Sequence, residues 1–234
     1  MTEQGRPIEL HYWPTPNGWK VSILLEELGI PYEVRWVDIG AGEQFRPEFL
    51  AIAPNNRMPA IVDPEGPGGQ PVSVFESGAI LLYLARKYAR FYPVDERRRI
   101  AVEEWLMWQM GGLGPMAGQA HHFRIYAPEP IPYAIDRYTG EAARLYGVMD
   151  RRLAGREWLA DEYSIADMAC VGWINAHERQ GQDLADYPDL RSWFERMTAR
   201  PAVARGLALG IEKRKATNPR DPKAARNLFG SSGG

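Results

Sequence analysis

The sequence is poor in cysteine: its 234 residues include only one, Cys170. A single thiol excludes an internal disulfide framework, a Cys-x-x-Cys redox pair and a cysteine-rich zinc site. Long hydrophobic runs are also missing, because the longest apolar stretch, residues 79–85, is far shorter than the roughly 20 residues that span a membrane. The N-terminal residues show no basic segment followed by an apolar one, so no signal peptide is predicted. We therefore expect a cytoplasmic protein without membrane contact.

An excess of positive charge is absent too. The formal net charge is -2 and the pI is near 6.1, which argues against a nucleic-acid-binding protein with a basic surface. Residues 211–234 depart from this balance, with six Lys and Arg against two acidic residues. Such a tail is either a nucleic-acid-binding arm or a disordered terminus, and we take it as disordered. No nucleic-acid partner is expected.

Metal-binding patterns are missing as well. No two of the four histidines are spaced four residues apart, as a zinc-binding helix requires. The adjacent pair, His121 and His122, would point about 100° apart on a helix and cannot easily share one ion. No phosphate-binding glycine loop and no Gly-x-Ser-x-Gly nucleophile motif is present. The sequence predicts no metal site.

The first third of the sequence alternates between strand and helix patterns. Apolar residues at every second position, Ile8, Leu10 and Tyr12, predict a strand, and an apolar stripe at helical spacing follows it. The later elements are predicted in this order: a strand at 32–37, a short helix near 46–53, strands at 60–62 and 72–75, and a helix at 77–88. This βαβαββα order predicts an α/β domain over residues 1–89 whose first two strands are parallel.

From residue 95 the pattern is entirely helical. Ile135, Tyr138, Ala142, Leu145 and Met149 are spaced by three and four residues, which is typical of one buried helix face. The sequence Ser-Ile-Ala-Asp at 164–167 predicts a capping box at the start of a further helix. We predict a linker at 90–94, an all-helical domain at 95–210 and a tail at 211–234.

Three short segments of the first domain carry groups suited to a ligand. Thr15-Pro-Asn-Gly18 lies between the first strand and its helix, an edge where open α/β sheets bind ligands. Met58-Pro59 precedes the third strand, where an extended residue, or a cis bond to proline, exposes backbone groups to a peptide ligand. Each segment also has a simpler interpretation, as a turn and as the end of a loop.

The third segment, Glu76-Ser77, lies at the start of the last helix of this domain. The free N–H groups of a helix N-terminus bind an anion, and the Glu76 carboxylate accepts an ammonium group. Together they fit the α-carbon end of an amino acid, although ordinary capping also explains them. The joint order of the three segments is more specific than any one of them.

From about residue 8 to residue 209 the sequence resembles the cytosolic glutathione transferases, and most closely their bacterial Nu class of disulfide-bond oxidoreductases. The similar segments include YWPTPNGWKVSILLEE, APNNRMPAIVD, FESGAILLYLARK and YSIADMAC. The resemblance implies a thioredoxin-like domain followed by an all-helical domain, a homodimer, and glutathione as the bound co-substrate. Small disulfides, peroxides or electrophiles are the implied substrates.

The same resemblance implies how glutathione is held. Met58, ahead of Pro59, pairs through its backbone with the cysteinyl part, and Glu76 and Ser77 hold the γ-glutamyl end. Gln44 and Arg57 are candidates for the glycyl end or for a neighbouring carboxylate.

Two further residues are candidate ligands of carboxylates. Nu-class sites hold two glutathione molecules or one glutathione disulfide, and Arg137 is the candidate for the second molecule, because a guanidinium grips a carboxylate with two bonds. Its alternative is a solvated helix face. Lys20 likewise either contacts a carboxylate or is a solvated surface lysine.

The resemblance places Thr15 and Asn17 beside the sulfur of glutathione. A thiol with a pKa near 8.5 is mostly protonated at neutral pH, so donors must stabilise the reactive thiolate. The Thr15 hydroxyl, the Asn17 amide and the helix N-terminus supply them. Tyr12 is the rival, since many glutathione transferases use a tyrosine there, but its alternation with Ile8 and Leu10 predicts that it packs inward.

Two functions follow from these residues. The first is a glutathione-dependent disulfide-bond reductase with peroxidase and modest transferase activity, in which bound glutathione thiolate attacks and a second glutathione resolves the mixed disulfide. The alternative is a non-catalytic or weakly catalytic glutathione-binding regulatory protein. The Nu class is related to a glutathione-transferase-like prion regulator of yeast nitrogen metabolism. The sequence lacks the long Asn/Gln-rich arm of that regulator, which favours the enzyme.

The sequence predicts that Cys170 takes no part in catalysis, because it lies in an almost wholly apolar helix. Cys170→Ala should leave glutathione-dependent turnover within about twofold of wild type, since the ligand supplies the reactive thiol. Steady-state kinetics test this, with circular dichroism as the control for folding. Loss of turnover in a folded variant would contradict it.

Overall fold

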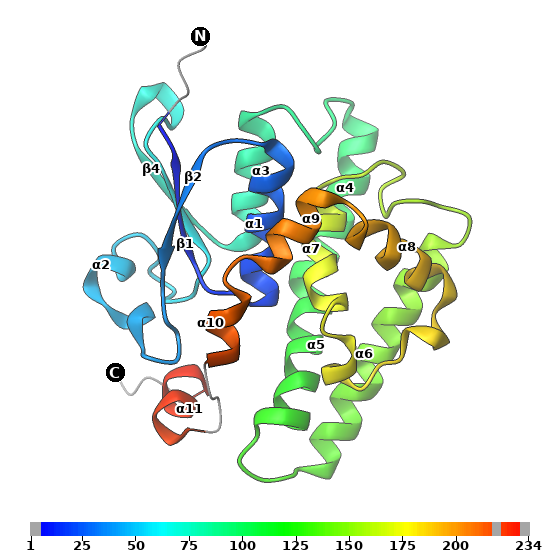
Figure 1. Cartoon of the computed structure of the whole chain (residues 1–234). Coiled ribbons are helices and arrows are strands. Elements are labelled where there is room, and N and C mark those ends of the chain that lie inside the picture. The colour runs from blue at the N-terminus through cyan, green and yellow to red at the C-terminus, as the bar shows by residue number, and fades with distance from the viewer. Residues whose placement is uncertain (1–5, 217–220, 230–234) are drawn as a thin grey trace. The chain divides into compact units, whose positions relative to one another are not determined.

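A computed structural model of the chain describes residues 6–216 and 221–229 (Figure 1). The chain divides into two compact units, one of Met1–Tyr83 with Arg205–Gly234 and one of Leu84–Ala204. The division falls inside helix α3 (Ser77–Lys87), before the linker predicted at 90–94.

The first unit is built on a four-stranded sheet. Its strands are β1 (Ile8–Tyr12), β2 (Tyr32–Trp36), β3 (Ala60–Asp63) and β4 (Val72–Phe75), in the order β2-β1-β3-β4. β1 is parallel to β2, with Ile8 opposite Tyr32, and β3 is antiparallel to both of its neighbours. Helices α1 (Pro16–Leu28) and α3 lie on one face of this sheet and the short α2 (Pro47–Leu50) on the other (Figure 1). The predicted βαβαββα thioredoxin-like fold is confirmed.

Helix α1 begins and ends at residues suited to those positions. Thr15 is its N-cap and Pro16 its first residue, where a missing N–H costs nothing. Gly29 ends the helix in the left-handed conformation, with φ of 67°, and donates its N–H to Leu25 O at 3.0 Å. The local sequence therefore sets both ends of the helix next to the candidate site.

The second unit is all-helical, as predicted. Its helices are α4 (Glu96–Trp108), α5 (Gly114–His121), α6 (Pro132–Leu153), α7 (Ile165–Ile174), α8 (Pro188–Thr198) and the start of α9 (Pro201–Ala208). Two π-helical turns, Gln109–Leu113 and His122–Tyr126, adjoin α5 on either side. The first of these turns contains Gly111 and Gly112 and joins α4 to α5 without a break in the helical backbone.

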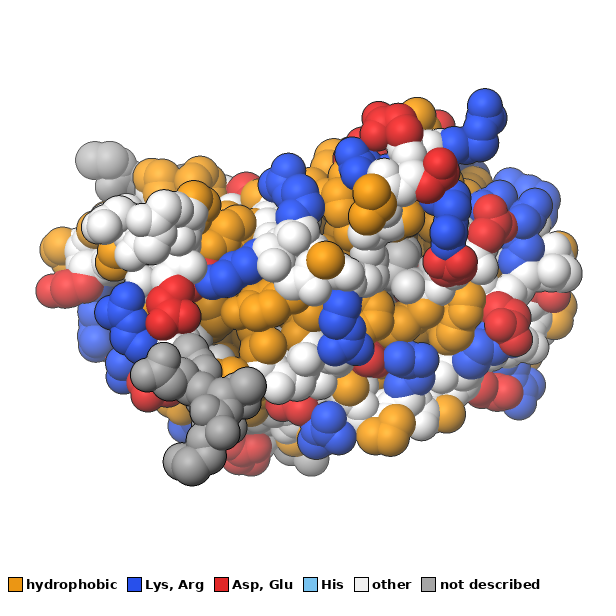
Figure 2. Space-filling model, turned by 90° about the horizontal axis from the view of Figure 1, so that it is seen from above, with side chains coloured by type: hydrophobic (Ala, Val, Ile, Leu, Met, Phe, Trp, Pro, Cys, Tyr) orange, Lys and Arg blue, Asp and Glu red, His pale blue; other side chains and the backbone are white. Residues whose placement is uncertain are grey.

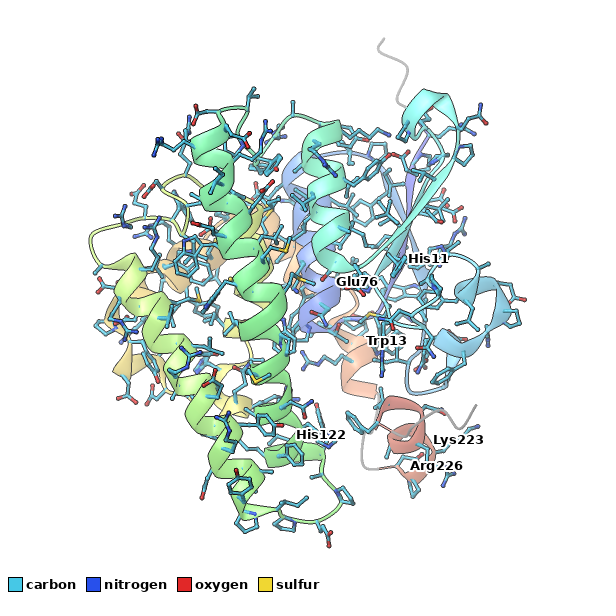
Figure 3. All side chains as sticks on the ribbon, turned by 180° about the vertical axis from the view of Figure 1, so that it is seen from behind. His11, Trp13, Glu76, His122, Lys223 and Arg226 are labelled. Atoms are coloured by element: carbon cyan, nitrogen blue, oxygen red, sulfur yellow. The ribbon has the colours of Figure 1, made fainter. Side chains whose placement is uncertain are left out.

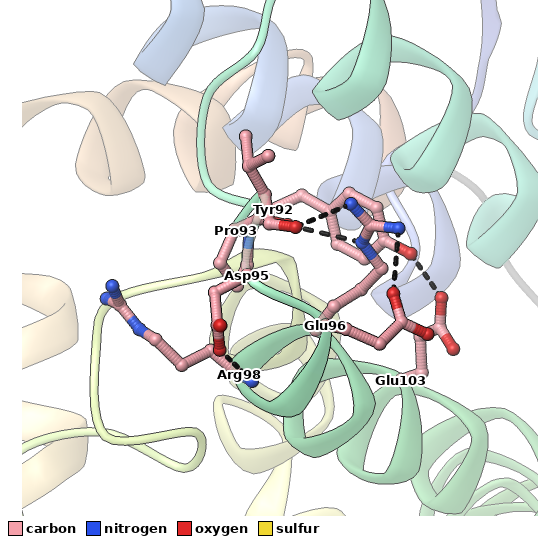
Figure 4. A network of polar contacts seen from close by, with 8 residues as sticks. Tyr92, Pro93, Asp95, Glu96, Arg98 and Glu103 are labelled. Carbon is pink, nitrogen blue, oxygen red and sulfur yellow. Dashed lines mark hydrogen bonds and ion pairs between the residues drawn. The ribbon is translucent and has the colours of Figure 1, made fainter.

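The segment at 90–94 is held against α4 (Figure 4). Arg99 donates to Pro93 O at 3.3 Å and to Val94 O at 2.9 Å, and the Tyr92 hydroxyl donates to the Glu103 carboxylate. These bonds fix the carbonyl groups that precede the helix, so this stretch is packed with the second unit.

Helix α9 leads the chain back to the first unit. The Ser22 hydroxyl donates to Gly206 O at 2.9 Å, and Arg205 Nε lies 2.6 Å from a carboxylate oxygen of Glu26. A Cβ atom at Gly206 would lie 2.7 Å from backbone and side-chain atoms of Ile23, so only glycine allows this approach. The last part of the chain is therefore an integral layer of the first unit.

The prediction of a disordered tail at 211–234 is wrong for the residues of this segment that the structure describes, because they form two helices. They are α10 (Ile211–Ala216) and α11 (Pro222–Phe229). Asp221 caps α11 by accepting the N–H groups of Lys223 and Ala224, and the Lys213 ammonium lies 4.7 Å from the ring centre of Trp36. The charge of the segment is a poor guide to its order, because two of its cations, Lys213 and Arg214, lie over the rings of Trp36 and Trp19. Residues 217–220 and 230–234 lie outside the part that the structure describes.

Charges of both signs are mixed on the surface. On the face shown in Figure 2, Lys and Arg side chains are interspersed with Asp and Glu side chains. Within residues 6–216 and 221–229, no helix is long and apolar enough to cross a membrane.

A buried carboxylate organises the second unit. Asp167 accepts the Ser164 N–H at 3.1 Å, and Ser164 Oγ accepts the Ala166 N–H, so the predicted capping box is confirmed. Asp167 also accepts the Leu159 N–H at 3.1 Å and the Trp193 indole N–H at 2.9 Å. Burial raises the pKa of Asp167 from 3.8 to about 6, although these three N–H donors and the Ser164 hydroxyl, which also donates to Asp167, oppose the rise.

Asp167→Asn should lower the free energy of unfolding by about 2–3 kcal/mol at pH 7, because the amide turns a donor toward N–H groups that the carboxylate accepts. The raised pKa means that the folded chain binds this proton more readily than the unfolded chain. The stability that Asp167 contributes therefore decreases as pH rises from 3.8 to about 6. The substitution should cost more at pH 4 than at pH 7.

Urea denaturation at both pH values measures these costs. Glu129→Gln is the matched control, because Glu129 is exposed and should show no comparable change. An equal cost of Asp167→Asn at pH 4 and pH 7 would contradict the raised pKa.

Candidate functional site

The end of β1 and the start of α1 approach each other closely. Thr15 Oγ1 accepts the Gly18 N–H at 3.2 Å, which satisfies one free donor of the first turn. A Cβ atom at Gly18 would lie 2.3 Å from Trp13 O and 2.8 Å from the Tyr12 ring. Glycine is therefore required here, and the N-terminus of α1 lies against the end of the strand.

The structure brings the three predicted segments together within the first unit. Three contacts join them: Thr15 Oγ1 with Met58 Sδ at 3.8 Å, Lys20 Nζ with Ser77 Oγ at 3.3 Å, and Asn55 Nδ2 with Glu76 Oε1 at 3.3 Å. Figure 3 shows Glu76 at the start of α3 and Trp13 after β1, on the same side of the sheet. Residues far apart in the sequence therefore share one edge of the sheet.

Met58 presents unused backbone groups at this edge. The Met58–Pro59 peptide bond is cis, and Pro59 is buried. The Met58 side chain packs against a buried cluster of Val37, Phe49, Ala53 and Ala60. Its backbone N–H and C=O form no hydrogen bond with any other residue that the structure describes. They are suited to pair with an extended peptide.

Glu76 and Ser77 form the start of α3. Glu76 O accepts the Ile80 N–H at 2.9 Å. Glu76 has a φ of 68°, a backbone conformation that residues other than glycine rarely adopt. Its carboxylate is exposed, whereas Ser77 is 4% exposed. Strained backbone of this kind is common at functional sites, and here it sets a carboxylate beside a helix N-terminus.

Lys20 is buried, with 1% of its surface exposed, so it is not a solvated surface lysine. It lies one turn before Leu24 on the apolar stripe of α1, which turns its side chain toward the interior. Its ammonium reaches Ser77 Oγ. A buried cation at the positive end of α3 favours an anion at that place.

Tyr12 points into the interior of the first unit. It is fully buried, its ring lies 6.0 Å from that of Trp36, and its hydroxyl donates to Leu209 O at 3.2 Å. Burial raises the pKa of the Tyr12 hydroxyl. The hydroxyl is thus engaged by the chain itself, as the alternation with Ile8 and Leu10 predicts.

Asn17 differs from Tyr12 in this respect, whereas the Thr15 hydroxyl already has two partners, the Gly18 N–H and Met58 Sδ. Asn17 is half-buried in the first turn of α1, and its side-chain amide forms no hydrogen bond with the residues described. No acidic side chain occupies this turn, so nothing there neutralises the positive end of the helix dipole. The N-terminus of α1 can therefore stabilise a negative charge.

The other predicted residues are less closely joined to this edge. Gln44 is 2% exposed, and its amide donates to Asn227 O at 3.0 Å. Arg57 is exposed and forms no ion pair among residues 6–216 and 221–229. Arg137 lies exposed on α6, in the second unit.

Two residues that the sequence did not single out belong to the same neighbourhood. Asn55 holds the Glu76 carboxylate, and its place in the polar run before Met58 was the available signal. Asn227 contacts Gln44 from α11, which lies in the segment whose charge predicts a disordered tail. Within the described residues, no three His, Cys, Asp or Glu side chains are grouped so that they could hold a metal ion.

A thioredoxin-like unit followed by a helical unit, with a peptide-pairing edge next to a helix N-terminus, is the architecture of a glutathione-binding protein. Two protein-family models match the chain. The model described as "Glutathione S-transferase, N-terminal domain" matches residues 7–86, and the one described as "Glutathione S-transferase, C-terminal domain" matches residues 115–201. The chain belongs to the glutathione S-transferase family.

Similar proteins are known in several bacteria. Disulfide-bond oxidoreductase YfcG of Escherichia coli is 54% identical over 86% of this chain and 94% of its own length. A glutathione transferase from Pseudomonas putida, solved with one glutathione disulfide per subunit, has a TM-score of 0.83 and 44% identity over 87% of this chain and 92% of its own. A Pseudomonas fluorescens family member, solved with two glutathione molecules bound, has a TM-score of 0.81 and 46% identity over 86% and 92%.

Proposed function

We propose that the protein is a glutathione-dependent disulfide-bond reductase with peroxidase and modest transferase activity. One observation carries the proposal: three contacts join Thr15 to Met58, Lys20 to Ser77 and Asn55 to Glu76 at one edge of the sheet. Similarity to a disulfide-bond oxidoreductase, and to structures that hold glutathione or its disulfide, supports the proposal.

Each part of glutathione has a partner of matching chemistry. The unused backbone groups of Met58, next to Pro59, pair with the cysteinyl residue as a short added strand. The Glu76 carboxylate binds the γ-glutamyl ammonium. Ser77, the N-terminus of α3 and the buried Lys20 ammonium bind the γ-glutamyl carboxylate.

The remaining carboxylates are assigned to residues at the margin of this edge. We assign Gln44 and Arg57 to the glycyl carboxylate, and Arg137 to the second glutathione or to the second half of glutathione disulfide. The relatives with one disulfide or two glutathione molecules per subunit support a site of that capacity.

The sulfur of bound glutathione is the nucleophile. Lowering a thiol pKa by about two units requires about 2.7 kcal/mol of preferential stabilisation of the thiolate. The Thr15 hydroxyl, the Asn17 amide and the uncompensated N-terminus of α1 supply donors for it. Tyr12 takes no direct part, because its hydroxyl is buried and bound to Leu209 O.

Reduction of a disulfide then takes two exchange steps. The thiolate attacks one sulfur of the substrate, the substrate S–S bond breaks, and the departing thiolate takes a proton, leaving a mixed disulfide with glutathione. A second glutathione thiolate attacks the glutathione sulfur of that mixed disulfide and releases the second substrate thiol. Two glutathione molecules are oxidised to glutathione disulfide, and the buried Cys170 is not required.

We also propose that the protein is a cytoplasmic homodimer. On α4, Ile100 and Met107 are 48% and 51% exposed and lie seven residues apart on one face of the helix, so two exposed apolar side chains there are suited to contact with a second copy. A reaction that consumes reduced glutathione belongs to a reducing compartment.

Glutathione-dependent reduction of 2-hydroxyethyl disulfide, coupled to glutathione reductase, tests the proposed activity. We expect saturable turnover at least about tenfold above the uncatalysed rate, because the site stabilises the thiolate. Glu76→Gln should raise KM for glutathione about tenfold by removing the carboxylate that binds its ammonium group.

Glu129→Gln, which changes an exposed carboxylate of the second unit, is the control for that substitution. Binding of glutathione without turnover above the uncatalysed rate would reject the enzyme and support the glutathione-binding regulator.

The assignment of the thiolate donors is tested by Asn17→Ala and Tyr12→Phe. Losing one donor to the thiolate should raise the pKa of bound glutathione by about one unit in Asn17→Ala, which lowers the thiolate fraction, and with it turnover, about fivefold at pH 6.5. Tyr12→Phe should lower the free energy of unfolding by about 1 kcal/mol, through the lost bond to Leu209 O, and leave that pKa unchanged.

Ultraviolet absorbance of the bound thiolate as a function of pH gives the pKa directly. A larger rise in Tyr12→Phe than in Asn17→Ala would overturn the assignment.

A further inference from the structure

The C-terminal helix α11 is attached to the loop that carries Gln44. Asn227 Nδ2 donates to Gly40 O at 2.7 Å, and Asn227 O accepts from Gln44 Nε2 at 3.0 Å. A Cβ atom at Gly42 would lie 3.2 Å from the Asn227 side chain, and Gly42 has a φ of 84°. One residue of α11 therefore bonds the loop at two points and is packed closely against it.

The loop itself is preorganised for this attachment. Asp38 Oδ1 accepts the Gly40 N–H at 2.9 Å and the Ala41 N–H at 3.1 Å, and Glu43 accepts the Asp38 N–H at 2.8 Å. These bonds hold the turn whose Gly40 carbonyl accepts the hydrogen bond from the Asn227 amide. The attachment is thus a defined contact between two ordered elements.

The hydrogen bonds of Gln44 leave it unable to bind an anion in this arrangement. A glutamine amide has two N–H donors, and those of Gln44 point at Asn227 O and, at 3.4 Å, at Ile39 O. Its oxygen, Oε1, is buried without a partner among the residues described, and it cannot accept a hydrogen bond from a carboxylate. Turning the amide over would set Oε1 against two carbonyl oxygens.

We propose that α11 is an autoinhibitory lid, which occupies the donor of Gln44 that the glycyl carboxylate of glutathione requires. The carboxylate binds only when Asn227 O leaves Gln44, so closure of α11 and binding of the glycyl end exclude each other. This inference rests on the proposed function, which assigns Gln44 to that carboxylate. The helix lies beyond residue 201, where the match to the family ends.

The lid affects the binding of one class of thiol and not of another. A γ-glutamyl thiol without a C-terminal glycine, such as γ-glutamylcysteine, makes no use of Gln44 and binds with α11 in place. Glutathione must displace the helix, and its apparent affinity is lowered by the fraction of molecules in which the lid is closed. Weakening the contact between α11 and the loop should therefore lower the Kd for glutathione and leave the Kd for γ-glutamylcysteine unchanged.

Asn227→Ala tests the lid, because it removes the donor to Gly40 O and keeps a residue that favours a helix. Isothermal titration calorimetry should give a Kd for glutathione about fivefold lower than in wild type, equivalent to about 1 kcal/mol, and an unchanged Kd for γ-glutamylcysteine. Lys223→Ala, an exposed residue of the same helix, should change neither value (Figure 3).

Each other outcome has a distinct meaning. An unchanged or higher Kd for glutathione in Asn227→Ala would overturn the lid and leave the proposed function intact. Equal tightening of both ligands would also overturn it, since the effect would not depend on the glycyl carboxylate. Absence of glutathione binding in wild type would reject the proposed function, and the lid with it.

Hydrogen exchange in the wild-type protein provides a test that needs no variant. Saturating glutathione should speed the exchange of amides in residues 222–229 at least about threefold, because displaced helices lose their protection. Saturating γ-glutamylcysteine should leave these amides unchanged. Unchanged or slower exchange with glutathione would show that α11 stays on the loop during binding, which would overturn the lid.

Discussion

The candidate site depends on the close approach of the α1 N-terminus to the end of β1. This approach requires Gly18, since any side chain there would meet Trp13 O and the Tyr12 ring. Lys20, two residues after Gly18 and buried, reaches Ser77 from the same turn of α1, and Thr15 faces Met58. One absent side chain therefore sets the positions of groups from three separate segments.

Sequence patterns predicted the strands and helices of residues 8–208 and named three segments that the structure brings to one edge of the sheet. Period-two and helical patterns located the strands and helices, because burial of one face dictates both patterns. Lys20 was harder, since a lysine is ordinarily solvated, yet its spacing from Leu24 already placed it on the apolar stripe. The tail was misjudged because net charge says nothing of the aromatic rings, such as Trp36, on which its cations pack.

Two hydroxyl groups at the end of β1 differ in what the fold leaves them free to do. The Tyr12 hydroxyl is buried and bound to Leu209 O, so the folded chain uses it as a structural link. Thr15 caps α1 with its oxygen and directs its proton toward a sulfur atom, that of Met58. Residue type alone does not distinguish the two, and only the structure shows which neighbours each hydroxyl has.

The return of α9 to the first unit constrains the order in which the protein can form. Ser22, Ile23 and Glu26 of α1 complete their packing only with residues 205 and 206, which lie about 180 residues further along the chain. The sheet and its first helix are therefore synthesised early but lack one covering layer until residues 205 and 206 have been made. During that interval the apolar face of α1 is exposed in the nascent chain, where it is a natural binding surface for chaperones.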